Sequence, residues 1–442
     1  MIRTVLDYLK LKRHQRRYSI QKIKDYQFKE LQKLLLYAQK KSSFYQKRLQ
    51  PYQINTLEDY HHIPTINKSM MMENFSTLNT CGLIKEDVEQ YAILKEKNKD
   101  YLGYYKDQYV IGLSSGTSGN RGIYITPKSM TKRLPGVFLA RSGLSLKDLP
   151  MRILFCLRVF SQGFNDINAP LIKLSYMPTM TPPEEIIRQI NQKNINILMA
   201  PPSLIRFLLP LKNEIKVKLK KIITYAEVLT KTDKMQFEQA FQTNVIEIYQ
   251  ASEGQIASAC EKGNLHINED LVYIELYDQE DQLITKPHVV GHKMVLTNLI
   301  NNAQPLIRYE MNDMIVLDDP CSCGSHFRTI EKILGRNDDL IYFYNSKGEQ
   351  KVVFPDLFSR WIITESEKVR EFQVVQYEVG VLDITIDCED ERIKDKLKQR
   401  LEVELKGLDL SAIIHITLQK LELPKDQNKY KRFISKVKIQ KN

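Results

Sequence analysis

The spacing of apolar positions first indicates a helical segment near the N-terminus. Between residues 20 and 50, Phe28, Leu31, Leu34, Leu35 and Ala38 recur every three or four positions. Because an α-helix turns once in about 3.6 residues, this spacing places the five side chains on one stripe. The pattern therefore predicts an amphipathic helix within residues 20–50.

From about residue 108 to residue 330 the pattern changes. Short apolar runs alternate with segments of helical period, which is typical of an α/β domain with parallel strands. In such domains the loops that follow the strands are the usual ligand-binding sites. The alternating segments are RILFCLRVF, PEEIIRQINQKNI, NILMAP, SLIRFLLPLKNEI, KLKKIITYAE, KTDKMQFEQAF and VIEIYQAS, and more β-like runs, VYIELYD, HKMVLTN and MIVLDD, follow them.

The last hundred residues predict a separate small α+β lobe. Strand-like alternation in VLDITIDC and AIIHITLQ flanks a helical period in ERIKDKLKQRLEVELKG, which Gly407 ends. A further helix is predicted around PDLFSRWIITE. We place the boundary near residues 335–339, which gives a large N-terminal domain of residues 1–335 and a small C-terminal domain of residues 336–442.

Composition narrows the class of protein. The 442 residues are 43% hydrophobic and 27% charged, which is ordinary for a folded soluble protein. No apolar run approaches the roughly 18 residues of a membrane-spanning helix, and the first residues lack the apolar stretch of a signal peptide. We therefore expect a cytoplasmic protein without a transmembrane segment.

The net charge of +12 raises the question of an anionic partner. Basic residues are spread along the chain, and no aromatic-interleaved recognition module accompanies their clusters at residues 10–17 and 429–441. We therefore expect a lysine-rich surface and no nucleic-acid partner. An alternative stays open, because Val5, Tyr8 and Leu9 recur at helical spacing beside basic residues, as in a helix that touches a membrane surface.

Residues 113–122 read LSSGTSGNRG and lie between two apolar runs. Glycines let backbone N–H groups turn toward an anion, and hydroxyls can donate to phosphate oxygens. The motif is not a Walker P-loop, because it lacks the required lysine. From these residues alone, the loop either holds a phosphate or is a flexible hairpin end.

Three of the six cysteines and one histidine form a second candidate site. Cys260 and His266 lie in CEKGNLH, and Cys321 and Cys323 form a Cys-x-Cys pair. Thiolates and an imidazole suit tetrahedral Zn²⁺, and four protein ligands indicate a structural rather than a catalytic metal. The alternatives are free structural cysteines, a redox Cys-x-Cys pair, or His326 as a substitute ligand.

Several segments together resemble the adenylate-forming superfamily, which includes acyl-CoA synthetases and peptide-synthetase adenylation domains. The likeness is strongest to its phenylacetate–CoA ligase branch and the related capsule-cluster and deazaflavin-coenzyme adenylyltransferase homologues, some of which carry zinc at the cysteine–histidine set. The order and spacing agree over roughly residues 25–440. The matching segments are SSGTSGNRG (114–122), IYQASEG (248–254), CEKGNLHINED (260–270), PLIRYEMND (305–313), CSCG (321–324) and ILGRNDD (333–339).

The resemblance implies a first reaction in which ATP and a small carboxylic acid give an acyl adenylate and pyrophosphate. The glycine-rich loop would hold the β- and γ-phosphates of ATP. Ser252 would touch the α-phosphate, and Glu253 would hold Mg²⁺. The implied phosphate-loop residues are Ser114, Ser115, Gly116, Thr117, Ser118 and Gly119.

The resemblance also implies how the nucleoside is bound. Tyr249 would flank the adenine, with Ala226 and Glu227 on its other side. Asp313 would accept hydrogen bonds from both ribose hydroxyls, and Arg336 would contact the ribose or phosphate region. The acid pocket is expected between residues 159–164, residues 201–203 and Tyr249.

Two further residues are implied for a mobile small lobe. Asp338 would be the pivot about which the lobe turns. In QNKYKRFISK, Lys429 would be the lysine that reaches the α-phosphate and the carboxylate, with Lys431 as the nearest competitor.

After the hinge the sequence departs from the family. In the ligases a glycine there lets the pantetheine arm of CoA pass, whereas this chain has Tyr344 and Asn345, with Gly348 in a predicted hairpin turn. We expect adenylation followed by transfer to the thiol of CoA or a carrier protein. The alternatives are adenylyl or acyl transfer to a hydroxyl or amine of a cofactor or cell-envelope precursor without CoA, and an inert scaffold homologue.

Overall fold

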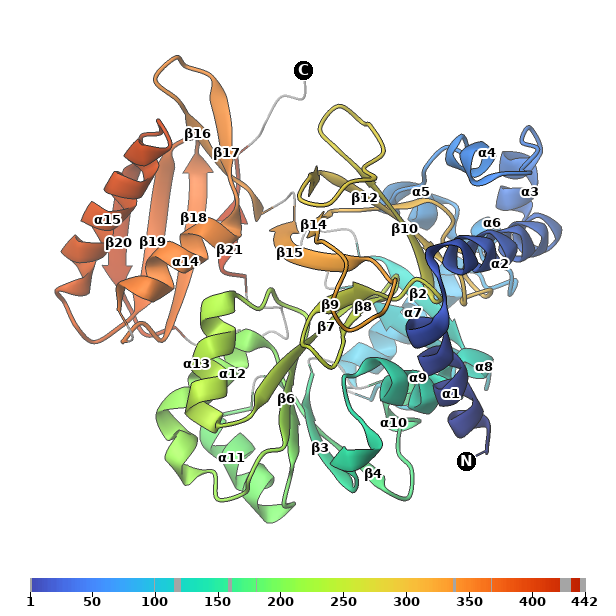
Figure 1. Ribbon diagram of the computed structural model, residues 1–442, viewed down its shortest axis with the longest axis horizontal. Coiled ribbons are helices and arrows are strands. Elements are labelled where there is room, and N and C mark those ends of the chain that lie inside the picture. Colours follow the sequence, from blue (N-terminus) through green and yellow to red (C-terminus); the bar gives the residue numbers. More distant parts are fainter. Residues whose placement is uncertain are drawn as a thin grey trace.

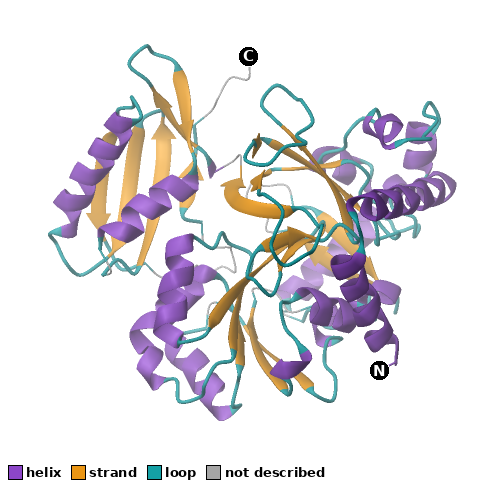
Figure 2. Cartoon of the chain, in the orientation of Figure 1, coloured by secondary structure: helices purple, strands orange, loops and turns teal. Residues whose placement is uncertain are grey.

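The computed structural model describes residues 2–98, 100–114, 121–157, 161–179, 181–336, 339–366, 368–421 and 431–437. The chain forms a large body and, from residue 341 on, a smaller lobe beside it (Figure 1). The expected class is confirmed: helices pack on sheets with both parallel and antiparallel strands (Figure 2). The predicted domain division after residue 335 stays a prediction.

The predicted helix within residues 20–50 is two helices in the structure. α2 (Ile20–Lys41) carries the expected apolar stripe, and α3 (Ser43–Leu49) follows after a break at Ser42. The Ser42 hydroxyl accepts a hydrogen bond from the Tyr45 backbone N–H at 3.2 Å. A serine in this position caps a new helix start, which explains the break. Further helices of this region are α4 (Leu57–His61), α5 (Lys68–Glu73), α6 (Phe75–Leu78) and α7 (Lys85–Lys97).

The first helix, α1 (Ile2–Arg17), packs closely against α9 (Leu134–Arg141). A Cβ atom added to Gly136 would lie 2.8 Å from atoms of α1, so only glycine allows this approach. Val5 and Leu9 are exposed, and contact of α1 with a membrane surface stays a prediction. Within the described ranges, no helix combines the length and apolar character needed to cross a bilayer.

Among the described residues, the largest sheet has ten strands in the order β11-β14-β15-β9-β8-β7-β6-β5-β3-β4. The five strands β3 to β7 are parallel, as the alternating pattern predicts, and the remaining pairings are antiparallel. The strands are β3 (Met151–Cys156), β4 (Ile172–Met177), β5 (Ile197–Met199), β6 (Lys221–Thr224), β7 (Asn244–Ala251), β8 (Gly254–Ala259), β9 (Leu265–Ile267), β11 (Val290–Gly291), β14 (Asp313–Leu317) and β15 (Thr329–Arg336).

Helices cover the parallel half of this sheet, and a short hairpin precedes it (Figure 1). The buried side chains of the helices and parallel strands form shared apolar clusters, which explains why the alternating pattern is so regular. The hairpin is β1 (Tyr109–Leu113) and β2 (Ile123–Pro127), and the helices are α8 (Lys128–Thr131), α10 (Gln162–Asn165), α11 (Pro183–Gln192), α12 (Pro202–Leu208) and α13 (Lys231–Phe241).

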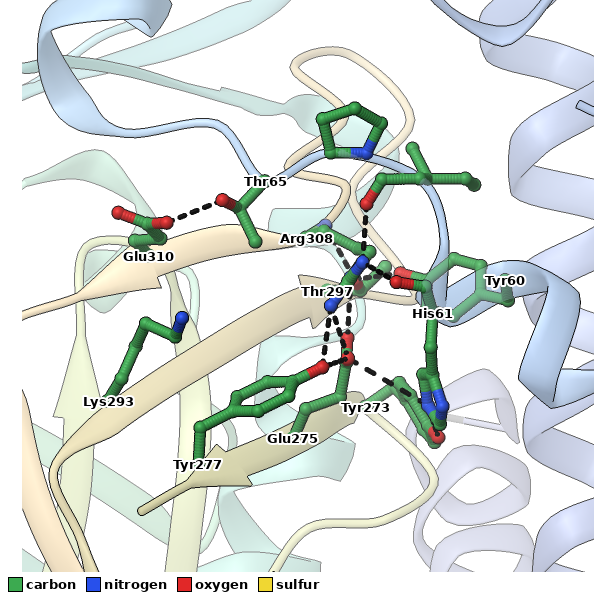
Figure 3. Close-up of polar contacts among 12 residues, drawn as sticks. Tyr60, His61, Thr65, Tyr273, Glu275, Tyr277, Lys293, Thr297, Arg308 and Glu310 are labelled. Atoms are coloured by element: carbon green, nitrogen blue, oxygen red, sulfur yellow. Dashed lines mark hydrogen bonds and ion pairs between the residues drawn. The ribbon is translucent and has the colours of Figure 1, made fainter. Parts of the chain in front are cut away.

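A second sheet of the large body contains β10 (Val272–Tyr277), β12 (Lys293–Asn298) and β13 (Tyr309–Met311). Its edge is tied to the N-terminal region by Arg308, shown in Figure 3.

The buried guanidinium of Arg308 has an acceptor for each of its five N–H groups. It donates to both carboxylate oxygens of Glu275 at 3.1 and 2.8 Å and to the Tyr277 hydroxyl at 2.6 Å. It also donates to the backbone carbonyls of His61 and Ile63 (Figure 3). Arg308 therefore fixes the start of β13 against both the second sheet and the loop after α4.

The small lobe contains a sheet in the order β20-β19-β18-β21 and a hairpin, β16-β17. The predicted helix is confirmed as α15 (Ile393–Gly407), and its buried residues repeat at four-residue spacing. The small lobe has a separate apolar core, formed by its helices and its sheet. The other elements are β16 (Ile341–Tyr344), β17 (Gln350–Val353), α14 (Pro355–Glu365), β18 (Glu371–Glu378), β19 (Val381–Asp387), β20 (Ile413–Leu418) and β21 (Phe433–Ser435).

Candidate functional site

A cleft of about 730 Å³ lies where the large body faces the small lobe. It gathers residues from motifs that are far apart in the sequence, together with residues after the hinge region. Its lining also includes Ser161, Phe164, Pro201 and Ser203, which belong to the segments expected to enclose an acid. The predicted site residues that line it are Ser114, Ala226, Glu227, Tyr249, Ser252, Glu253, Asp313 and Arg336.

Some predicted site residues lie outside the described residues. They are Ser115, Gly116, Thr117, Ser118, Gly119, Asp338 and Lys429. At the base of the glycine-rich loop, the Ser114 backbone N–H donates to the Gly122 carbonyl at 2.8 Å, and the Gly122 N–H donates to the Ser114 hydroxyl at 2.7 Å. Ser114 thus closes the end of the β1–β2 hairpin, so the loop begins and ends at the cleft.

Tyr249 lies on the strand where the large sheet changes from parallel to antiparallel. The first half of β7 pairs with the parallel β6, and the second half pairs with the antiparallel β8, with a register shift between Tyr249 and Gln250. The Tyr249 hydroxyl is buried, and no described residue is in hydrogen-bonding geometry with it. Burial, and next the negative charge of Asp313, raise the pKa of this phenol. Tyr249 lines the cleft at this change of strand direction.

Ser252 and Glu253 form the two-residue turn between β7 and β8. The Glu253 carboxylate accepts a hydrogen bond from the Tyr124 hydroxyl at 2.5 Å, and its backbone carbonyl accepts one from the Asn298 amide at 2.7 Å. Burial raises the pKa of Glu253, and the bond from Tyr124 opposes the rise. Tyr124 was missed in the sequence, because it stands in an ordinary apolar strand run 129 residues before Glu253.

Asp313 and Arg336 meet across the end of the antiparallel half of the sheet. They are opposite each other on β14 and β15, and Arg336 Nε lies 3.6 Å from a carboxylate oxygen of Asp313. Both side chains line the cleft. The arrangement presents a carboxylate acceptor and a cation side by side, as hydroxyls and phosphates of a nucleotide require.

The loop after β6 also lines the cleft, through Ala226 and Glu227. Ala226 has a positive φ of 67°, which places an L-residue in the left-handed region and indicates a constrained backbone at the cleft. The carboxylate of Glu227 accepts hydrogen bonds from the Ser203 backbone N–H at 3.0 Å and from its hydroxyl at 2.8 Å. Glu227 therefore caps the start of α12, and its carboxylate is fixed by this helix.

Glu247, which is half-buried, is a second residue that the sequence motifs did not single out. It lines the cleft two residues before Tyr249, on the same face of β7, and burial raises its pKa to about 7. Its oxygen accepts from the Leu229 backbone N–H at 3.4 Å. A glutamate within the apolar run VIEIY was the available signal.

From the small lobe, Lys431 reaches the cleft. Its ammonium lies 3.2 Å from an oxygen of Asp339, which follows the hinge segment. Lys431 was the competitor of Lys429 in the sequence, and it is the one of the two that the described residues include. The cleft thus contains a lysine carried by the small lobe.

The cysteine–histidine set comes together away from the cleft. Ligand atoms of Cys260, His266, Cys321 and Cys323 all lie within 4.8 Å of one another, and His326 is not among them. The Cys260 and Cys321 sulfurs are 3.9 Å apart, and Cys323 Sγ is 3.5 Å from His266 Nε2. Tetrahedral Zn²⁺ with ordinary bond lengths separates two sulfurs by about 3.8 Å and a sulfur from a nitrogen by about 3.6 Å.

The protonation of His266 also fits a metal. Its Nδ1 lies 2.9 Å from the Phe327 carbonyl oxygen, which only accepts, so Nδ1 carries the hydrogen. Nε2 then directs its lone pair at the cysteines, the orientation that a second hydrogen bond gives to a metal-binding imidazole. The donor set is therefore suited to a structural zinc that joins the β8–β9 hairpin to the loop between β14 and β15.

Comparisons with known proteins bear on the fold. The sequence matches no protein-family profile and no curated protein. Among solved structures, 2-hydroxyisobutyryl-CoA ligase in its postadenylation state is similar with a TM-score of 0.73 and 15% identity, covering 96% of this chain and 91% of that one.

Two further structures show the range of the similarity. The same ligase in its thioesterification state, with CoA, gives a TM-score of 0.59 at 16% identity, over the same shares of both chains. An anthranilate CoA ligase with anthranoyl-AMP gives 0.52 at 14% identity, over 72% of this chain and 64% of that one. The chain therefore has the fold of CoA ligases that form acyl adenylates.

Proposed function

We propose that this protein is an ATP-dependent ligase that joins a small carboxylic acid to AMP, releasing pyrophosphate, and then transfers the acyl group to the thiol of CoA or a carrier protein. One observation carries the proposal. A single cleft combines Asp313, Arg336, Tyr249 and Glu253 with a lysine from the small lobe, on the fold of acyl-adenylate-forming ligases. The cysteine–histidine set further supports the phenylacetate–CoA ligase-like branch.

The barrier to the first step is electrostatic. A carboxylate must approach the α-phosphate of ATP while both carry negative charge, so catalysis requires positioning and positive charge. Lys429 is the proposed source of that charge. Lys431 is a second candidate, because it lines the cleft. Either lysine would leave the cleft when the small lobe turns about Asp338.

The nucleotide would be held by groups that stand at fixed positions. Asp313 would accept from the ribose hydroxyls and Arg336 would contact the ribose or phosphates, while Tyr249 and the Ala226–Glu227 segment would enclose the adenine. Residues 114–119 would hold the β- and γ-phosphates, and Ser252 the α-phosphate.

Glu253 is the proposed Mg²⁺ ligand. Its carboxylate lines the cleft and is oriented by Tyr124, which leaves an oxygen for a cation. When bound, Mg²⁺ would neutralise part of the phosphate charge.

A second candidate function transfers an adenylyl or acyl group to a hydroxyl or amine without CoA. The hairpin after the hinge favours it, because Tyr344 ends β16 and Asn345 begins a tight turn to Gly348, which has φ of 77°. The glycine that would open a passage for pantetheine is therefore in a turn, several residues beyond the hinge.

Acid-dependent pyrophosphate release, measured over a panel of carboxylic acids with and without CoA, tests both candidates. The proposed ligase releases pyrophosphate with its acid and forms a thioester when CoA is added. Release without any thioester would select the second candidate. Absence of release with every acid would contradict acid activation and favour the inert homologue.

A further inference from the structure

Four charged side chains alternate in sign across the boundary between the lobes. In the large body, Arg206 of α12 binds Asp233 of α13 through two hydrogen bonds, of 2.8 and 3.2 Å. Its remaining terminal nitrogen donates to Glu371 of β18, in the small lobe, at 2.7 Å. Glu371 in turn accepts from Arg432 at 2.7 and 3.1 Å.

These charges are withdrawn from water. The side chains of Arg206, Asp233 and Glu371 are 3%, 0% and 0% exposed, and that of Arg432 is 12% exposed. The Phe372 backbone N–H adds a further donor to Glu371 at 3.0 Å. A buried charge is tolerated when it is paired and hydrogen-bonded, and here each one is.

We propose that Arg206 and Glu371 form a releasable latch, which holds the small lobe in the arrangement seen here and so positions its cleft-lining residues during acyl-AMP formation. The inference rests on the proposed function, since it concerns which of two steps the enzyme performs. Arg206, Asp233 and Glu371 are not among the described residues that line the cleft, so they act as positioning residues.

The order of the charges explains why the latch can open. Of the ion pairs among these four side chains, only the one between Arg206 and Glu371 joins the two lobes, so it is the one lost when the lobes separate. Asp233 keeps Arg206 in the large body, and Arg432 keeps Glu371 in the small lobe. Neither half is left with an unpaired charge, so opening avoids the large cost of breaking an isolated buried ion pair.

The latch is joined to both walls of the cleft. On one side, α12 begins with Ser203, which holds Glu227, and reaches the latch through Arg206. On the other side, Arg432 follows Lys431, whose carbonyl accepts from the Gln373 amide at 2.8 Å. The strand that bears Glu371 therefore also fixes the backbone of the cleft-lining lysine.

Glu371→Gln tests the latch, because it keeps the shape of the side chain and removes its charge. The matched control is Arg370→Gln, at the neighbouring position, since the described residues that Arg370 pairs with, Asp387 and Glu389, both belong to the small lobe. Arg206→Lys is a milder second variant, because one ammonium cannot reproduce the three bonds of the guanidinium.

The first measurement is the distance between fluorophores carried by non-natural amino acids at the exposed positions Leu171 and Val403, one in each part. We expect the wild type with AMP to populate the separation seen in this structure. Glu371→Gln should shift the ratio of latched to released molecules by on the order of tenfold, with a smaller shift for Arg206→Lys and none for Arg370→Gln. Identical distributions for Glu371→Gln and wild type would overturn the latch.

The second measurement separates the two steps. Glu371→Gln should slow acid-dependent pyrophosphate release about tenfold, while the reaction of added acyl adenylate with CoA changes less than about twofold. A purely structural role would slow both steps equally, and that result would overturn the proposal. If the wild type makes no acyl adenylate, the proposed function fails, whereas the distance measurement still decides the latch.

Discussion

Asp313 and Arg336 stand opposite each other on neighbouring strands, with Arg336 Nε 3.6 Å from an oxygen of Asp313. The aspartate ends one sequence motif, and the arginine is the last strand residue before the hinge segment. The proposed ribose acceptor therefore touches the residue that leads into the small lobe. In the proposed function, nucleotide binding and lobe orientation would both involve this contact.

Asp313→Asn should weaken AMP binding by about 10- to 100-fold. The carboxylate accepts hydrogen bonds from ribose hydroxyls through both oxygens, whereas the neutral amide has one acceptor oxygen and one donor NH2 group. Calorimetric titration with AMP measures the effect. Asp383→Asn is the control, since Asp383 is an exposed aspartate of β19. Equal affinities for Asp313→Asn and wild type would remove Asp313 from the nucleotide site.

The two tail lysines should differ in their effect on acyl-AMP formation. Lys429→Gln is expected to lower the rate by about 100-fold or more, as for loss of a charge that stabilises the transition state. Lys431→Gln should lower it by about tenfold, because Lys431 is partly neutralised by Asp339. The measurement is acid-dependent pyrophosphate release for both variants. The reverse order of effects would transfer the catalytic role to Lys431.

Purified protein should contain about one zinc ion per chain, bound by Cys260, His266, Cys321 and Cys323. Cys323→Ser should lose the metal and lower the melting temperature by on the order of 5 °C, since zinc binding contributes directly to folding. Cys388→Ser is the control, because that cysteine lies in the core of the small lobe. Elemental analysis that finds no zinc in the wild type would contradict the site.

Glu247 should make stability fall as the pH rises. Burial raises the pKa of Glu247 from the usual 4.5 of a glutamate to about 7, so the folded state binds the proton more tightly than the unfolded chain. The favourable contribution is complete below pH 4.5 and is lost as the pH rises toward 7. Because the residue is half-buried, we expect the free energy of unfolding to fall by on the order of 2 kcal/mol between pH 4.5 and pH 7.

Glu247→Gln mimics the protonated form and provides the comparison. Urea unfolding of both proteins should give nearly equal stabilities at pH 4.5, with the variant more stable above pH 7. A difference that does not change with pH would show that Glu247 does not titrate in this interval.

Features that depend on contacts between residues close in sequence were predicted correctly, whereas features that depend on contacts between distant residues were not. The four-residue repeat of α15 and the parallel strands were predictable, because burial on one face depends on local spacing. The break at Ser42 was missed, since a serine cap interrupts a stripe without changing its period. The hydrogen bond from Tyr124 to Glu253 depends on tertiary packing, and no local pattern encodes it.

The candidate site shows the same division. Motifs with a family resemblance indicated Asp313, Tyr249 and Glu253, and the fold places all three at one cleft. The contact of Arg206 with Glu371 joins residues 165 positions apart, in segments that resemble no motif. Such a pair can be identified only from a structure, because it depends on how the two lobes are oriented.

The Arg308 guanidinium sets a limit on how far the chain can be shortened. Two of its acceptors are the carbonyls of His61 and Ile63, so a truncated protein that starts after residue 66 would leave buried N–H groups without partners. Each unsatisfied group costs about 1–3 kcal/mol. Residues 61–63 are therefore an integral part of the folding unit, and a shortened protein has to retain them.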